Sequence, residues 1–110
     1  MSVAPAMPPS IAEIGEAVRM VCGDRPVECV QLFGSVASGK AHARSDVDLL
    51  IEFIPGARVG LLEMGGIKEE LEEHLGCHVD LLSRSAVERG RNPYRRQSIL
   101  AAPVTVYARR

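Results

Sequence analysis

The sequence has few cysteines and no framework for disulfide bonds. The three cysteines, Cys22, Cys29 and Cys77, are an odd number at unrelated spacings, which does not indicate a set of paired bridges. Unpaired thiols of this kind are typical of proteins in a reducing cytosol, where they are often buried. We therefore expect three free cysteines.

The chain also lacks an excess of positive charge and a long apolar run. Its 13 basic and 14 acidic residues give a net charge of −1, which argues against a direct nucleic-acid binder because no positive field attracts phosphates. No apolar stretch approaches the length of a membrane span. The amino terminus lacks the basic and apolar regions of a signal peptide. We therefore expect a cytoplasmic protein.

The length and the hydrophobic pattern indicate one small domain. A chain of 110 residues can bury one core but is too short for two, and 46% hydrophobic residues is ordinary for a globular protein. Three prolines within Met1–Pro9 predict a mobile tail, so the expected domain covers residues 10–110. The expected elements are a capped helix over 11–21, a strand over 28–33, a strand over 46–53, a helix over 60–75, a strand over 77–82 and a short closing strand over 104–107.

The second helix carries an internal conflict. Its expected apolar stripe consists of Leu61, Met64, Ile67, Leu71 and Leu75. Gly65 and Gly66 lie within the same stretch, and each costs about 1 kcal/mol relative to alanine inside a helix. We therefore expect either a helix that begins after these glycines or a mobile segment around them.

The segment 30–53 contains most of the residues that indicate a chemical function. An apolar run ends at Gly34-Ser35, ten residues follow, and an alternating strand then begins at Asp46-Val47-Asp48. Side chains two apart on a strand lie on the same face, about 7 Å apart along the backbone, so Asp46 and Asp48 project together. Paired carboxylates suit a hard cation such as Mg²⁺, and a Gly-Ser turn lets backbone N–H groups approach phosphate oxygens. Each signal alone is weak, because Asp-x-Asp is often a solvated strand start and Gly-Ser a plain turn.

A third carboxylate has the same pattern. Asp80 alternates with Val79 and Leu81 in a predicted strand. If this strand lies beside the second strand, Asp80 faces the same side as Asp46 and Asp48. The alternative is a polar residue on an exposed sheet face.

Together these features resemble the DNA polymerase beta superfamily of nucleotidyltransferases. Ser45 before Asp46 and the Leu-Leu-Ile-Glu-Phe run after Asp48 resemble its minimal nucleotidyltransferase branch, the MntA-like antitoxins, from about Ser10 to Tyr107. The resemblance implies an α/β (α+β) fold with a small mixed sheet flanked by helices. It also implies an enzyme that transfers AMP from ATP to a hydroxyl group, with a tyrosine of a HEPN-type toxin as the expected acceptor and the toxin as the expected partner.

Seven residues are candidates for the site, five of them with roles that the resemblance implies. Asp46, Asp48 and Asp80 would be catalytic and would ligate two Mg²⁺ ions about 4 Å apart, with Asp80 helping to activate the attacking oxygen. Gly34 and Ser35 would hold the β and γ phosphates of ATP. Lys40 and Arg44 lie in the loop between Ser35 and Asp46, where they either help to bind the triphosphate or belong to a solvated loop. One difference from the family weakens this binding of the triphosphate: relatives commonly carry arginine at the positions of Val36 and Ser38.

Other interpretations stay open. The chain could neutralise its partner by occlusion with an inactive nucleotide site, which the missing arginines favour. It could instead be a small-molecule nucleotidyltransferase that works as an oligomer. A zinc site at His74, Cys77 and His78 is disfavoured, because Gly76 breaks the helix between the histidines and no second ligand pair exists.

Overall fold

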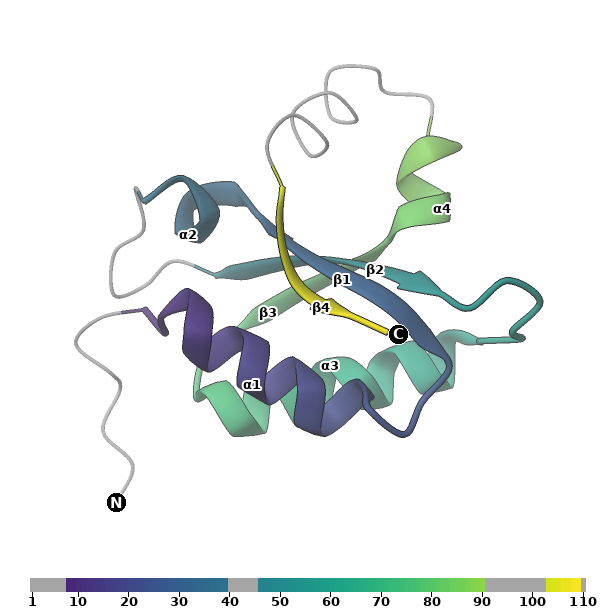
Figure 1. Ribbon diagram of the computed structural model, residues 1–110, viewed down its shortest axis with the longest axis horizontal. Helices are drawn as coiled ribbons and strands as arrows, with labels where there is room; N and C mark the ends of the chain where they lie inside the picture. Colours follow the sequence, from purple (N-terminus) through teal and green to yellow (C-terminus); the bar gives the residue numbers. More distant parts are fainter. Residues whose placement is uncertain (1–7, 40–45, 91–102, 110) are drawn as a thin grey trace.

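The computed structural model describes residues 8–39, 46–90 and 103–109, which form a four-stranded mixed sheet covered on one face by two helices (Figure 1). The predicted α+β class with a small mixed sheet is therefore confirmed. Most of the expected N-terminal tail lies outside the described residues. The elements in chain order are α1 (Ile11–Cys22), β1 (Val27–Phe33), α2 (Gly34–Ser38), β2 (Val47–Phe53), α3 (Leu61–Leu75), β3 (Val79–Ser83), α4 (Arg84–Glu88) and β4 (Val104–Ala108).

The strand order β3-β2-β1-β4 places β2 and β3 side by side at one edge of the sheet. β1 runs antiparallel to both β2 and β4, whereas β2 and β3 run parallel and are connected through α3. The residue pairs Val47–Val79 and Asp48–Asp80 fix the register of this parallel pair. Since parallel strands need a long crossover connection, α3 is what allows β3 to begin beside the start of β2.

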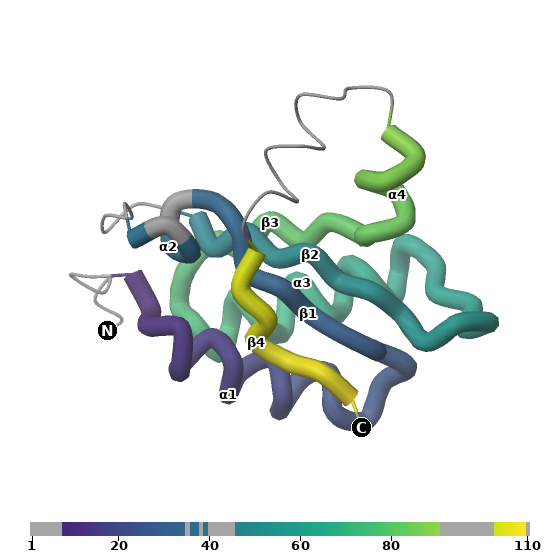
Figure 2. Tube along the Cα trace, turned by 45° about the horizontal axis from the view of Figure 1, so that its top comes forward, coloured from purple at the N-terminus to yellow at the C-terminus, as the bar shows by residue number. Residues whose placement is uncertain are grey.

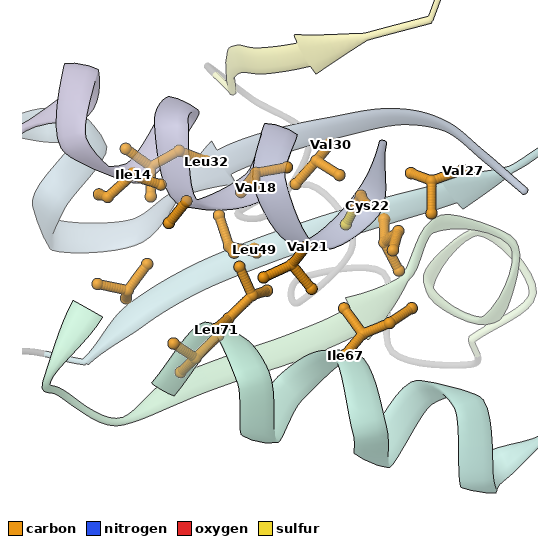
Figure 3. Packing of buried hydrophobic residues seen from close by; sticks show 14 of the residues in the cluster. Ile14, Val18, Val21, Cys22, Val27, Val30, Leu32, Leu49, Ile67 and Leu71 are labelled. Atoms are coloured by element: carbon orange, nitrogen blue, oxygen red, sulfur yellow. The ribbon is translucent and has the colours of Figure 1, made fainter. Parts of the chain in front are cut away.

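The core lies between the sheet and the helices α1 and α3, which Figure 2 shows on the same side of the strands. Figure 3 shows Ile14 and Val18 of α1, Leu49 of β2, and Ile67 and Leu71 of α3 packed together. The predicted capping box of α1 is present: the Glu13 N–H donates to the Ser10 hydroxyl at 3.1 Å, and the Ser10 N–H donates to the Glu13 carboxylate at 3.0 Å. None of the helices within residues 8–39, 46–90 and 103–109 is long and apolar enough to cross a membrane.

A helix that begins after Gly65 and Gly66, and a buried Leu61, were wrong expectations for α3. The helix runs unbroken through Gly65 and Gly66, because Met64, Ile67 and Leu71 around them pack against the core and offset the conformational cost of glycine. Leu61 does not belong to the buried stripe, because it is 91% exposed.

The sheet face opposite α1 and α3 is only partly covered. Leu50 projects to this face between Asp48 and Glu52, yet it is only 1% exposed. Arg84 at the start of α4 donates to the Gln31 side chain on β1 at 2.7 Å, and Gln31 is the register partner of Leu50, so the guanidinium crosses β2 at this level. This face is therefore covered at Leu50, whereas Asp46 is exposed and Asp48 and Asp80 are half-buried at the start of β2 and β3.

The cysteines fit the expected chemistry. All three are free, with Cys22 buried in the core and Cys29 and Cys77 half-buried. Burial raises the pKa of the Cys22 thiol to about 11, so it stays protonated at neutral pH.

Candidate active site

Three aspartates gather at one end of the sheet, on the face that α1 and α3 leave open. Asp46 directly precedes β2 and Asp48 is the second residue of that strand, so both side chains project to the same side. Asp80 is paired with Asp48 across the parallel strands β2 and β3, and paired residues on neighbouring strands face the same way. The structure therefore brings together the three carboxylates that the sequence singles out.

Burial of their neighbours sets this orientation. Val47, Leu49 and Val79, which flank the aspartates, are all 0% exposed on the core side. A register slip of one residue would place a carboxylate in the core and a valine in water. The alternating pattern therefore fixes the direction of Asp48 and Asp80 as firmly as it fixes the core.

Burial and the neighbouring carboxylates disfavour the charged form of Asp48 in this cluster. The pKa of Asp48 lies above its ordinary value of 3.8, chiefly because burial disfavours the charged form. The neighbouring carboxylates of Asp80 and Asp46 raise this pKa further, and His78 acts in the opposite direction. A positive charge placed among these groups would relieve both penalties.

We expect the substitution Asp48→Asn to stabilise the cation-free protein at neutral pH. Because the folded-state pKa of Asp48 exceeds its unfolded value, its ionisation opposes folding, and this penalty disappears as the pH falls through the folded-state pKa. Urea denaturation at pH 7 should therefore show a higher free energy of unfolding for Asp48→Asn than for the wild type, and a smaller gain near pH 3.8. Glu52→Gln, at an exposed position on the same strand face, is the matched control. An equal gain at both pH values would contradict the electrostatic explanation.

The donor set fits a cation that binds together with a substrate. Within the described residues, no three His, Cys, Asp or Glu side chains are arranged closely enough to form a metal site by themselves. The aspartates offer oxygen atoms on one accessible face, which suits Mg²⁺, because this ion is usually held by one or two carboxylates with substrate phosphates and water rather than by a complete protein cage. The residues present therefore fit the metal that the sequence suggests.

Gly34 lies directly against Asp48. It follows β1, whose last residue Phe33 is paired with Asp48, and its φ of +78° is in the left-handed region that favours glycine. A Cβ atom at position 34 would lie only 2.2 Å from the Asp48 carboxylate. The glycine of the Gly-Ser turn is therefore required both by the backbone and by the aspartate that it contacts.

The remaining predicted phosphate-binding residues are placed only in part. The backbone of Ser35 belongs to α2, beside Gly34. Lys40 and Arg44 lie outside the described residues, within the segment 40–45. Val36, at a position where the family resemblance implies an arginine, is 8% exposed and packs into the core, so this position supplies no charge to the site.

Two further residues border the aspartates that the sequence pattern did not assign to the site. The His78 Nδ1 atom lies 3.6 Å from the Asp46 carboxylate, and its Nε2 atom lies 3.9 Å from the Glu72 carboxylate. Glu72 belongs to a run of glutamates in α3, Glu69, Glu70, Glu72 and Glu73, whose pattern alone indicates a solvated helix face. The position of Glu72 four residues before Gly76 could have distinguished it from the solvated glutamates. The left-handed C-cap at Gly76, with φ of 68°, turns the chain back past the last turn of the helix, where Glu72 lies.

A separate groove lies away from the aspartates. A groove of about 730 Å³ lies at the other ends of β2 and β3, between the β2–α3 connection and α4. It is lined by Phe53, Met64, Leu82 and Arg84 among others, and by none of the three aspartates. The chemistry therefore belongs to the carboxylate end of the open face.

A mixed sheet that presents paired aspartates after a Gly-Ser turn is the arrangement of a nucleotidyltransferase. The family model described as "Nucleotidyltransferase domain" matches residues 14–102. The chain belongs to this family, and the predicted family membership is confirmed.

Named relatives are adenylyltransferases. A Methanocaldococcus jannaschii protein, provisionally named a protein adenylyltransferase, is 33% identical over 82% of this chain and 91% of its own length. The protein adenylyltransferase MntA of Thermococcus cleftensis is 40% identical over 56% of this chain and 60% of its own length.

Solved structures have the same fold. A structure described as a minimal nucleotidyltransferase matches with a TM-score of 0.62 and 39% identity, over 82% of this chain and 86% of that chain. A chain from the complex of a tri-AMPylated Shewanella oneidensis HEPN toxin with MNT antitoxin matches with a TM-score of 0.61 over 87% of this chain and 71% of that chain. At 14% identity, the second likeness concerns the fold alone.

Proposed function

We propose that this protein transfers AMP from ATP to a tyrosine hydroxyl of a HEPN-type toxin and acts as its antitoxin. The observation that carries the proposal is the cluster of Asp46, Asp48 and Asp80 on one accessible sheet face, with Gly34 against Asp48. The adenylyltransferase relatives and the fold shared with a toxin-bound antitoxin complex support the choice of donor and partner.

The three aspartates would hold Mg²⁺. When bound, the metal would neutralise charge on the triphosphate and lower the pKa of the attacking hydroxyl. The tendency of Asp48 to protonate is the property expected of a carboxylate placed for a cation, since its own neighbours repel its charge.

The residues of the chain would then align the reactants. The Gly34-Ser35 backbone would hold the β and γ phosphates, because the absence of a side chain at position 34 lets a phosphate approach. Asp80 would accept the proton of the acceptor hydroxyl. The hydroxyl oxygen forms a bond to the α-phosphorus, the bond from that phosphorus to the β-phosphate oxygen breaks, and pyrophosphate leaves.

A second function is favoured by one observation. Val36 is buried in the core, where family relatives commonly place an arginine that can meet a triphosphate. If no other cation serves this purpose, the chain would neutralise its partner by occlusion alone. The two functions differ in whether a covalent adenylate appears on the partner.

Intact-mass spectrometry of a co-purified toxin partner tests the proposal. Incubation with this protein, ATP and Mg²⁺ should add one or more AMP groups to the toxin, and peptide mapping should place them on tyrosine. Samples with EDTA, or with an ATP analogue in which a methylene group replaces the oxygen between the α and β phosphorus atoms, are the controls and should show no addition. An unmodified toxin that is nevertheless inhibited would reject the enzyme and favour occlusion.

A further inference from the structure

Glu72 anchors the start of β3, one residue before the third aspartate of the site. Its carboxylate accepts a hydrogen bond from the backbone N–H of Val79 at 3.0 Å. The same oxygen accepts a hydrogen bond from the Lys68 ammonium group, also at 3.0 Å. Val79 is fully buried and directly precedes Asp80. β3 is an edge strand, and the backbone N–H of Val79 finds its partner in a side chain of α3.

The same carboxylate also approaches the residue that contacts Asp46. His78 lies between the two acids, with Nε2 at 3.9 Å from Glu72 and Nδ1 at 3.6 Å from Asp46. The backbone carbonyl of His78 accepts the N–H of Val47 at 3.0 Å, which joins the start of β3 to the start of β2. One side chain of α3 is therefore connected to the segments that carry all three aspartates.

The chemistry of Glu72 suits an anchor. The hydrogen bond from the Val79 N–H, followed by that from Lys68, holds the pKa of Glu72 below its ordinary value, so the side chain remains a carboxylate at neutral pH. A charged acceptor makes a stronger hydrogen bond than a neutral one. Asp80 and Asp46 repel the charge of Asp48, and the contact from Glu72 reaches the start of the edge strand from outside this cluster.

We propose that Glu72 is a positioning residue for nucleotidyl transfer. It holds Asp80 opposite Asp48 through the Val79 amide and orients Asp46 through His78. This inference rests on the proposed function for its activity readout, and it makes a separate structural claim about the Val79 amide.

Two substitutions at Glu72 and one control test the proposal. Glu72→Ala removes the acceptor, and we expect kcat for AMP transfer to fall about tenfold or more, because small displacements of reacting groups are costly. Glu72→Gln keeps an oxygen that can accept the Val79 N–H, and we expect it to restore kcat to within about threefold of the wild type. Glu73→Ala, at an exposed position on the same helix, should leave kcat unchanged.

Hydrogen exchange at the Val79 amide gives a readout that does not depend on catalysis. Exchange should be faster in Glu72→Ala and close to wild type in Glu72→Gln and Glu73→Ala. The kcat values are compared at a temperature at which thermal unfolding curves show that every variant is folded. A general loss of stability then does not lower kcat. Wild-type kcat in Glu72→Ala, or a Glu72→Gln variant no better than Glu72→Ala, would overturn the proposal. If the wild-type protein itself transfers no AMP, the proposed function fails, and unchanged Val79 exchange in Glu72→Ala would then reject the anchor independently.

Discussion

Replacing Asp46 and Asp48 together by asparagine should abolish AMP transfer while leaving the complex with the partner intact. Asparagine has nearly the shape of aspartate, and both positions lie on an accessible face, so packing is hardly disturbed. What the double variant loses is the charge that would hold Mg²⁺ against a triphosphate, and with it the stabilisation of charge in the transition state. We expect transfer to fall by about a thousandfold or more, measured as AMP added to the toxin per unit time.

The same variant distinguishes a catalytic antitoxin from a protein that inhibits its partner by occlusion alone. Partner affinity, measured by calorimetry, should change little if the contact lies outside the aspartate cluster. Growth rescue of cells that express the toxin should be lost with the double variant and retained with Glu52→Gln, which removes an exposed carboxylate from the same strand face. Full rescue by the double variant would reject the catalytic antitoxin and support inhibition by occlusion.

The position of the aspartates could be predicted from the sequence because burial enforces it. Val47, Leu49 and Val79 must face the core, and the alternation of a strand then sends Asp46, Asp48 and Asp80 to the other side. That β2 and β3 are neighbours does not follow from alternation. It depends on the path of α3 between them, and the resemblance to the family supplied this expectation.

The features that were missed depend on contacts between distant segments. The sequence indicates a solvated glutamate at position 72, but the turn after Gly76 brings the start of β3 back to it. Leu50 falls on the polar face of an alternating strand, but Arg84 reaches across β2 to Gln31 at its level. Propensity and periodicity describe one element at a time, so contacts of this kind require the fold.

The contact between Gly34 and Asp48 leads to the second large effect, in the variant Gly34→Ala. The new methyl group would lie 2.2 Å from the Asp48 carboxylate, so the aspartate must move away from its position opposite Asp80. An alanine at a φ of +78° also carries a backbone cost of about 1–2 kcal/mol. We therefore expect a lower free energy of unfolding and a loss of AMP transfer of about a hundredfold or more, because the displaced carboxylate no longer faces the substrate.

Gly39→Ala separates the two causes. Gly39 has nearly the same backbone conformation, with φ of +76°, but a Cβ atom there would meet nothing within 4 Å among the residues that the structure describes. This variant should show the backbone cost alone, by urea denaturation, and should keep its transfer rate. In an Asp48→Ala background the close contact at position 34 is largely removed, so the destabilisation by Gly34→Ala should shrink to that of Gly39→Ala. Equal destabilisation by the two single variants, together with undiminished transfer in Gly34→Ala, would mean that the turn tolerates a side chain and that Gly34 does not set the position of Asp48.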